Sequence, residues 1–355
     1  MTTTTPPAAG ADAPSPRPRK QEQEPASTVV NEVAPGVLRM QLPIQMPGLG
    51  HVNTYALVDD RGVALMDPGL PGPASWSALV ERLADVGLTP SDVHTVYVTH
   101  SHPDHFGLAS RLVREGNEVE LITHEAFAAG LRRAEGEELM LFDVEEDDVP
   151  TGNPYEGTTP WGVVWERPPD AVHSDFDWPA PSRFVRDGDV LMLAGREMFV
   201  VYSPGHTLDH ICLHDPEQEL LFTGDHVLPT ITPHISGLGS GRDPLDQFEE
   251  ALERVGTMDG IRLALPAHGQ PFTDLRGRTE SIRAHHEERL LRLRAVSREI
   301  GPATVSKLSE FLFRPDHWGP MADAETYAHL EHLRLAGLAE RHGEGRSMVY
   351  ELAAP

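Results

Sequence analysis

The segment "THSHPDH" (99–105) places three histidines and an aspartate directly after the short apolar run "VHTVYV" (93–98). The run is typical of a buried β-strand. His100 and His102 lie two residues apart on the loop that leaves it, so both imidazoles can turn toward one point. A polar loop in which Asp104 caps the next helix would explain the same letters. A metal site needs further ligands from the rest of the chain.

Three later segments offer such ligands, each at the end of a predicted strand: His206 in "SPGHTLDH", Asp225 in "LLFTGDH" and His268 in "LALPAHG". Sheet proteins commonly place their sites at strand ends, so these groups can converge. Imidazole and carboxylate bind zinc and similar divalent ions, and a catalytic ion keeps a position open for water. Seven groups are too many for one tetrahedral ion but fit two ions that share a carboxylate and a hydroxide. The seven are His100, His102, Asp104, His105, His206, Asp225 and His268.

Strand and helix patterns alternate through the first half of the chain. "VNTYALVDDRGVALMDPG" predicts a hairpin that turns at Asp-Asp-Arg-Gly, "SWSALVERLADVG" predicts a helix and "EVELIT" predicts a further strand. "DHFGLASRLVREG" (104–116) carries apolar residues at helical spacing and predicts one helix. Strands resume from "DVLMLAG" onward. The alternation predicts an α/β layered fold.

The ordered set His-x-His-x-Asp-His, Gly-His-Thr, Gly-Asp and a late His-Gly resembles the motifs of the metallo-β-lactamase fold superfamily of metallohydrolases. The resemblance covers roughly residues 29–272. It implies an αββα sandwich with the site along one edge. "LMDPGL" resembles the Asp-x-Gly turn of the family, so Asp67 is expected to orient a ligand from outside the ligand set.

Carried over residue by residue, the resemblance divides the seven ligands between two metal ions. A hydroxide between the ions is then the nucleophile. Zinc is the expected metal, although iron and manganese accept the same ligand types. The first ion is expected at His100, His102 and His206, and the second at Asp104, His105 and His268, with Asp225 bridging.

Composition divides the rest of the chain. Residues 1–28 are rich in Thr, Pro, Ala and charge, which predicts a disordered tail. Residues 29–272 are the expected catalytic domain, in which the acidic and aromatic segment 131–185 is an insertion that can serve as a lid. Residues 273–355 hold three helix patterns and a strand–Gly–strand pattern, and look like a small helical winged-helix domain. The combination resembles the subgroup related to β-lactamase-like protein 2.

The candidates for catalysis are Asp104, His226 and His234. Asp104 is a ligand that is also expected to take up a proton. His226 directly follows the bridging aspartate and His234 lies just beyond, so either can donate a proton to the leaving group or contact the substrate. An ordinary packed histidine explains these two equally well. His285 and His286 lie in a charged helix pattern and are expected to be solvated.

The net charge of the 355-residue chain is −26, which disfavours a nucleic acid as partner because such binding depends on Lys and Arg. Residues 276–355 contain 12 Lys and Arg and 12 Asp and Glu, so this unit shows no excess of basic residues either.

The single cysteine, Cys212, suits a reducing compartment and a place in a strand core. With no apolar segment that would export or anchor the chain, we expect a cytoplasmic protein without a membrane partner. The C-terminal helices favour a homodimer.

The motifs define the chemistry more firmly than the substrate. The favoured function is metal-dependent hydrolysis of a thioester or ester of a small acyl group, free or bound to a carrier. The subgroup includes endoribonucleases, and its fungal relatives act as thioesterases that release polyketides from carrier proteins. An endoribonuclease or phosphodiesterase is therefore the main alternative. A lactonase, a persulfide dioxygenase with a single iron and a nucleic-acid-binding regulator are further alternatives.

Overall fold

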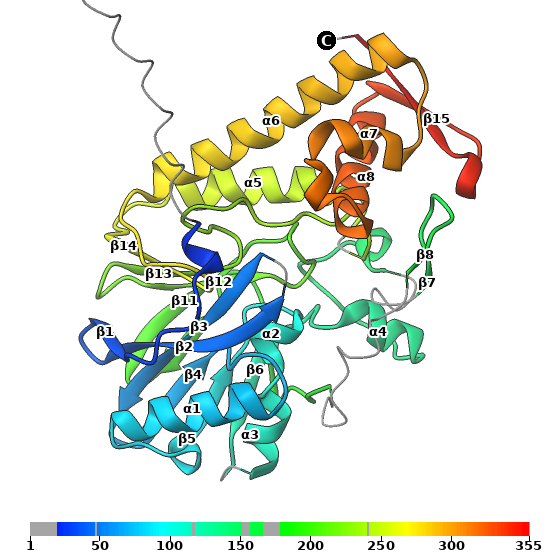
Figure 1. Ribbon diagram of the computed structural model, residues 1–355. Helices are drawn as coiled ribbons and strands as arrows, with labels where there is room; N and C mark the ends of the chain where they lie inside the picture. The colour runs from blue at the N-terminus through cyan, green and yellow to red at the C-terminus, as the bar shows by residue number, and fades with distance from the viewer. Residues whose placement is uncertain are drawn as a thin grey trace, which may run out of the picture.

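The computed structural model describes residues 20–46, 48–115, 118–150, 157–165, 178–239 and 241–354. The first 19 residues of the predicted tail, and residues 151–156 and 166–177 of the predicted insertion, lie outside the described residues. The predicted α/β class is confirmed: two sheets pack face to face and helices cover both outer faces (Figure 1). Among the described helices, none is both long enough and apolar enough to cross a membrane.

The first sheet has the strand order β1-β2-β3-β4-β5-β6-β9. Its first four strands are antiparallel, whereas β4, β5, β6 and β9 run parallel. The predicted hairpin corresponds to β3 and β4, and the apolar run before "THSHPDH" is β5. The bounds are β1 Asn31–Ala34, β2 Val37–Met46, β3 Leu49–Asp59, β4 Gly62–Met66, β5 Val93–Tyr97, β6 Glu120–His124 and β9 Arg183–Val185.

The second sheet has the order β10-β11-β12-β13-β14, in which only the pair β13 and β14 is parallel. Strand β13 is buried on both faces, because Leu220 and Phe222 point into the core between the sheets while Leu221 points to the helices outside. The bounds are β10 Val190–Leu193, β11 Arg196–Tyr202, β12 Ile211–Asp215, β13 Leu220–Gly224 and β14 Leu263–Pro266.

Three apolar cores join these layers. Helices α1 (Pro73–Asp85) and α3 (Ala109–Glu115) cover the outer face of the first sheet. Helices α5 (Pro244–Gly256) and α6 (Leu275–Ile300) cover the outer face of the second (Figure 1). Between the sheets, the ring of Tyr55 meets that of Phe222 edge-on at 5.3 Å. This is the αββα sandwich that the sequence resemblance implied.

The single helix predicted over residues 104–116 is wrong, because the structure breaks it in two. Helix α2 (Pro103–Phe106) ends before α3 begins at Ala109. Between them, the Leu108 backbone N–H donates to the Gly69 carbonyl at 3.2 Å instead of to its own helix. A Cβ at Gly107 would lie 2.2 Å from the Pro71 ring, so the chain there packs directly on the loop after β4. The turn lets α2 face the site and α3 cover the sheet.

Parts of the predicted tail and insertion lie against the body of the protein. Gln21–Gln23 form a short 3-10 helix, and the buried Glu22 accepts a hydrogen bond from the Thr230 backbone N–H at 2.7 Å. Within the predicted insertion, Arg183–Val185 form the edge strand β9 described above. Its other described elements are α4 (Ala129–Ala134), which begins just before it, a 3-10 turn at Glu146–Asp148, β7 (Gly157–Thr158) and β8 (Val164–Trp165).

The C-terminal unit has the elements that the sequence predicted. Helix α6 is followed by α7 (Val305–Leu312), α8 (Pro320–Leu335) and an antiparallel hairpin of β15 (Ala339–His342) and β16 (Val349–Leu352). The unit has its own apolar core and lies beside α5, above the sandwich in the view of Figure 1.

Candidate metal centre

The loop after β5 carries the first candidate ligands, and Asp67 fixes the start of this loop. The Thr99 backbone N–H and hydroxyl both donate to the Asp67 carboxylate, each at 2.8 Å. Asp67 itself adopts a left-handed backbone conformation with φ 52°, and its carbonyl accepts from the Thr54 hydroxyl at 2.7 Å. This arrangement directs the chain from β5 into the site, so that His100 and His102 face the end of the second sheet.

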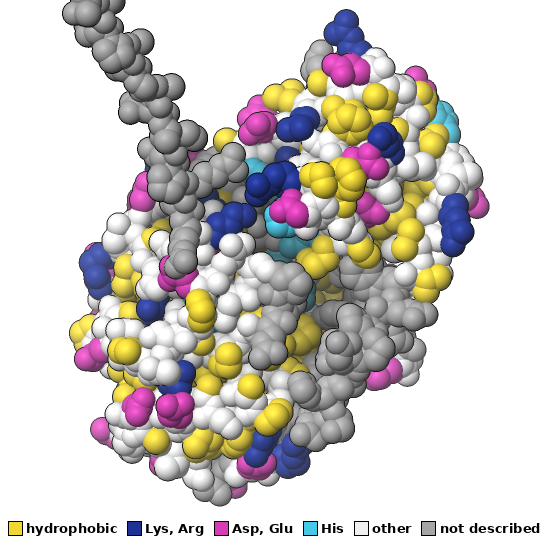
Figure 2. Space-filling view, viewed as in Figure 1, with side chains coloured by type: hydrophobic (Ala, Val, Ile, Leu, Met, Phe, Trp, Pro, Cys, Tyr) yellow, Lys and Arg dark blue, Asp and Glu magenta, His cyan; other side chains and the backbone are white. Residues whose placement is uncertain are grey.

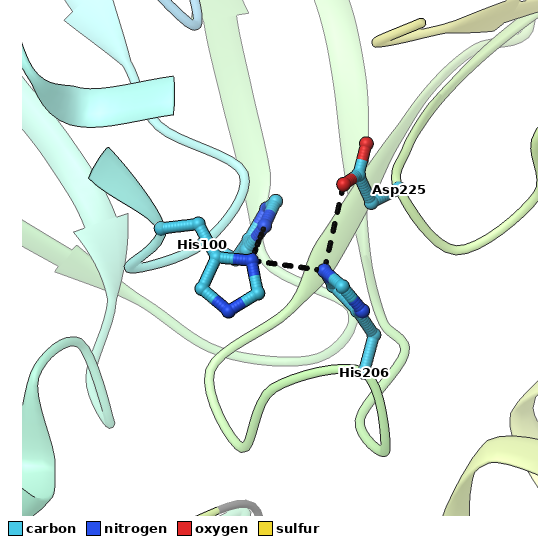
Figure 3. Close-up of side chains that lie close together, drawn as sticks. His100, His206 and Asp225 are labelled. Atoms are coloured by element: carbon cyan, nitrogen blue, oxygen red, sulfur yellow. Dashed lines mark hydrogen bonds and ion pairs between the residues drawn. The ribbon is translucent and has the colours of Figure 1, made fainter. Parts of the chain in front are cut away.

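The first group of candidate ligands consists of His100, His102, His206 and Asp225, whose ligand atoms all lie within 4.8 Å of one another. Nδ1 of His102 lies 3.0 Å from Nε2 of His100 and 3.0 Å from Nε2 of His206. Nε2 of His206 lies 3.4 Å from Oδ2 of Asp225. Figure 3 shows the labelled side chains of His100, His206 and Asp225 converging from separate loops.

The second group consists of Asp104, His105 and His268. Oδ2 of Asp104 lies 3.5 Å from Nε2 of both histidines. Asp225 adjoins this group as well, because its Oδ2 lies 3.6 Å from Nε2 of His105 and its Oδ1 lies 3.2 Å from Nε2 of His268. One carboxylate therefore touches both groups, which is the place that the resemblance implied for Asp225.

The unpaired atoms of the cluster fit metal ions. Nε2 of His105, Nε2 of His268 and Oδ1 of Asp225 are buried and have no hydrogen-bond partner among the described residues. Two nitrogen ligands of one tetrahedral zinc ion, each about 2.0–2.1 Å from it, lie roughly 3.3 Å apart. The 3.0–3.6 Å separations in the cluster lie around this value. Nitrogen and oxygen atoms in such an arrangement can hold two divalent ions.

Outer hydrogen bonds direct one nitrogen of each of three ligands toward the cluster. Nδ1 of His206 donates to the His234 carbonyl at 2.7 Å, and Nδ1 of His268 donates to the His51 carbonyl at 2.6 Å. Nδ1 of His105 lies 2.9 Å from Oδ2 of Asp67, so the expectation that Asp67 orients a ligand agrees with the geometry. Such partners fix the tautomer and the ring orientation of a ligand histidine.

The pKa shifts of the histidines differ between the two groups of candidate ligands. Burial and the neighbouring imidazoles hold the pKa of His100 and of His102 well below the usual value. Burial also opposes the charged form of His105, but the carboxylates of Asp104, Asp225 and Asp67 raise its pKa well above the usual value. Burial would raise the pKa of Asp225, yet His268 and His105 hold it well below the usual value. His100 and His102 are thus neutral, as ligands must be, and Asp225 is ionised.

The glycine before Asp225 has a steric role. A Cβ at Gly224 would lie 2.6 Å from Nε2 of His210, in a left-handed backbone conformation with φ +49°. The close approach lets the Asp225 backbone N–H donate to Nε2 of His210 at 3.1 Å, while Nδ1 of His210 donates to the Ser203 hydroxyl at 2.7 Å. His210 therefore holds the backbone of Asp225 from behind.

The structure places the remaining candidates unequally. Asp104 and His234 lie at the cluster, but His226 points away from it. The ring of His226 is buried against Phe248 at 4.9 Å, and burial lowers its pKa to about 3. His234 is partly exposed and lies beside the first group.

The expectation that His286 is solvated is wrong. Its side chain is buried against Phe248 and lies 3.1 Å from Nε2 of His329. Charged residues surround His286 in the sequence, but α5 and α8 cover its face of α6.

Sequence reasoning missed two residues at the edge of the site. Glu325 on α8 lies 3.1 Å from Nδ1 of His234, and Arg289 on α6 forms an ion pair with the same carboxylate. Neither lies in a recognisable motif. The sequence shows only that one residue is acidic and the other basic. Each lies in a helix with many other charged residues, which suggests an exposed face.

Comparison with known proteins agrees with the family resemblance of the motifs. Residues 47–283 match the family profile described as "Metallo-beta-lactamase superfamily". The chain is 28% identical over 297 residues to an atrochrysone carboxyl ACP thioesterase of Aspergillus fumigatus, covering 80% of this chain and 75% of that protein. Over 129 residues it is 33% identical to an acyl-coenzyme A thioesterase of Gallus gallus, covering 36% of this chain and 40% of that protein.

A solved structure extends the similarity to nearly the whole chain. The crystal structure of a metallo-beta-lactamase family protein from Thermus thermophilus is similar at a TM-score of 0.71 with 31% sequence identity, covering 90% of this chain and 100% of that one. With the motifs in order and the fold shared, the chain belongs to the metallo-beta-lactamase superfamily, and the prediction that it is a hydrolase is confirmed.

Proposed function

We propose that this hydrolase uses two divalent metal ions to cleave the thioester bond between an acyl group and a carrier thiol. The observation that carries the two-ion assignment is the position of Asp225, whose carboxylate lies within 3.2–3.6 Å of ligand atoms from both groups. Four ligands on one side and three on the other exceed the needs of one tetrahedral ion.

The chain's own residues have distinct roles in this proposal. Two bound divalent ions, zinc above all, would activate a water molecule and polarise the carbonyl of the substrate. Asp104 lies between His105 and His268 and can accept a proton at its carboxylate. His234 lies at the edge of the first group with its side chain a quarter exposed, so it can contact a bound substrate. The assigned ligands are His100, His102 and His206 for one ion, and Asp104, His105 and His268 for the other, with Asp225 shared.

The surface around the site suits an anionic carrier. Figure 2 shows histidine side chains in a hollow between the sandwich and the C-terminal unit, with Lys and Arg side chains at its rim beside Asp or Glu side chains. A chain of net charge −26 repels anions over most of its surface, so the basic side chains of this rim are where a phosphate-bearing carrier such as coenzyme A would approach. The thioesterase names of two relatives support the same substrate class.

The test is a metal analysis joined to a substrate panel. The purified protein is expected to hold close to two metal ions per chain and to hydrolyse acyl-coenzyme A or acyl-pantetheine thioesters of some chain length. A lactone and a short single-stranded RNA are assayed beside them. His102→Ala should lower kcat/KM by more than about a hundredfold, since removal of a ligand should exceed the 10–100-fold cost of losing an outer partner.

The matched control is His94→Ala, which removes a partly buried histidine from the adjacent strand β5. Nε2 of His94 contacts Asp59 at 3.3 Å and no member of the cluster. This variant is expected to keep its activity. RNA cleavage without thioester cleavage would reject the proposed substrate class, and one tightly held ion per chain would reject the two-ion assignment.

A further inference from the structure

The loop 228–239 joins the metal centre to the C-terminal unit. It follows β13 and carries His234, whose carbonyl accepts from Nδ1 of the ligand His206. On its other side the loop is held by two helices of the C-terminal unit. Nε of Arg278 on α6 donates to the Leu228 carbonyl at 2.6 Å, and the Gly237 backbone N–H donates to the Ala324 carbonyl on α8 at 3.2 Å. The loop is therefore fixed between a metal ligand and the added helices.

One series of side-chain contacts crosses this loop. Arg289 on α6 pairs with the carboxylate of Glu325 on α8, and the other oxygen of that carboxylate lies 3.1 Å from Nδ1 of His234. The His234 main chain then holds His206 at 2.7 Å. Three consecutive contacts thus lead from the C-terminal unit to a candidate metal ligand.

The carboxylate of Glu325 is suited to hold this loop rigidly. A carboxylate only accepts hydrogen bonds, so it fixes the proton of His234 on Nδ1 and sets the orientation of the ring. Arg289 compensates the charge of Glu325, which is 8% exposed and would be costly to bury alone. Without this partner the loop would lose the side-chain contact nearest to the carbonyl that His206 requires, and the hydrogen bonds of Leu228 and Gly237 would remain to hold it.

We infer that Glu325 is a positioning residue of the metal centre: through His234 it fixes the orientation of His206, so the C-terminal unit completes the site. This inference rests on the proposed metal-dependent function. It makes the C-terminal unit part of the active site, and it assigns the effect to one of the two metal positions. The second group has its own outer partners, Asp67 and the His51 carbonyl, and neither belongs to the C-terminal unit.

The experiment measures metal affinity in the full-length, zinc-loaded protein. Zinc is withdrawn by a graded series of chelators, and the zinc remaining per chain is counted. Glu325→Ala should release one of the two ions at a 10–100-fold lower chelator strength and keep the other as the wild type does. The chelator strength that releases this ion from Glu325→Gln should lie between the values for Glu325→Ala and the wild type. The amide oxygen of Gln still accepts from His234, while the ion pair with Arg289 is lost.

Glu331→Ala is the matched control. Glu331 lies on the same helix, is also 8% exposed and pairs with Arg334 and Arg341, but it faces Tyr350 in the core of the C-terminal unit. It should destabilise the unit without changing the release of either ion. Thermal unfolding of each variant reports any general loss of structure.

A double-mutant cycle decides whether the effect passes through the side chain of His234. His234→Ala should weaken the binding of the same ion. Adding Glu325→Ala should weaken that binding little further, because both changes break one series of contacts. Equal effects of Glu325→Ala and Glu331→Ala on metal release, or additive effects in the cycle, would overturn the inference. Thioester cleavage by the wild type is scored separately, so a failure of the proposed substrate does not decide this test.

Discussion

Oδ2 of Asp67 lies 2.9 Å from Nδ1 of His105 and also accepts a hydrogen bond from the Thr99 hydroxyl. Oδ1 of the same carboxylate accepts from the Thr99 backbone N–H. One side chain from the end of β4 thus fixes both the loop after β5 and a histidine on α2. The position of the second group of candidate ligands therefore depends on a residue outside the ligand set.

Asp67→Asn should therefore weaken metal binding at the second group by about 10–100-fold. The new amide nitrogen would face a group that now donates a hydrogen bond to the Asp67 carboxylate. Either His105 or Thr99 would therefore lose its acceptor. Chelator competition with counted zinc checks this. Asp59→Asn, which alters a carboxylate that pairs with Arg61 at the surface, should leave metal affinity unchanged. A normal second ion in Asp67→Asn would contradict the role of Asp67.

Gly205→Ala should lower the free energy of unfolding by about 3 kcal/mol. Gly205, just before the ligand His206, has φ +118°, and a Cβ there would lie 2.4 Å from Cβ and 2.6 Å from Cα of Phe248. Helix α5 would have to move. Gly188→Ala, at φ +76° with no atom within 4 Å of an added Cβ, should cost only about 1 kcal/mol for the backbone conformation. Urea unfolding compares the two, and equal losses would show that the contact with Phe248 carries no cost.

Acid should destabilise the fold through His286. Burial and the neighbouring His329 lower the pKa of His286 to about 2, whereas an unfolded histidine titrates near 6.5. Below pH 6.5 the unfolded chain therefore binds a proton that the folded chain does not, and stability falls as the pH decreases. Between pH 6.5 and pH 4 this residue should account for about 2–3 kcal/mol of the loss.

His286→Phe should reduce the decline in stability over that pH range by this amount. Urea unfolding of metal-free wild type and variant at pH 7, 5.5 and 4 isolates the difference, since the metal ligands titrate alike in both. An identical pH dependence would contradict the buried, neutral state of His286.

Trp161→Ala should destabilise the C-terminal unit by about 3–5 kcal/mol. Trp161 lies in the predicted insertion, but its ring is buried in the core of that unit, 4.9 Å from Tyr327. The 60%-exposed Val164 of the same β7–β8 hairpin provides the control, because Val164→Ala should change stability by less than about 0.5 kcal/mol. Thermal unfolding of both variants tests whether this hairpin ties the insertion to the C-terminal unit.

The candidate ligands could be found in the sequence because each directly follows a strand or starts a helix with a clear local pattern. The break at Gly107 could not, because the apolar spacing of residues 104–116 continues through it and contacts with the distant loop after β4 interrupt the helix. The burial of His286 was missed for a related reason, since two other helices cover it. Glu325 meets His234 across 91 positions of the chain, and nothing local predicts that contact.

The ligands of the proposed metal centre are made at different times during synthesis. The loop 99–105 leaves the ribosome 163 residues before His268, an interval of about 10–30 s at ordinary rates of translation. Strand β14 must then pair with β13 before His268 can face His105. Glu325 follows later still. We therefore expect the complete metal centre to form only after β14 has left the ribosome, and a chain cut short after α6 would keep every candidate ligand while lacking the contact that holds the loop of His234.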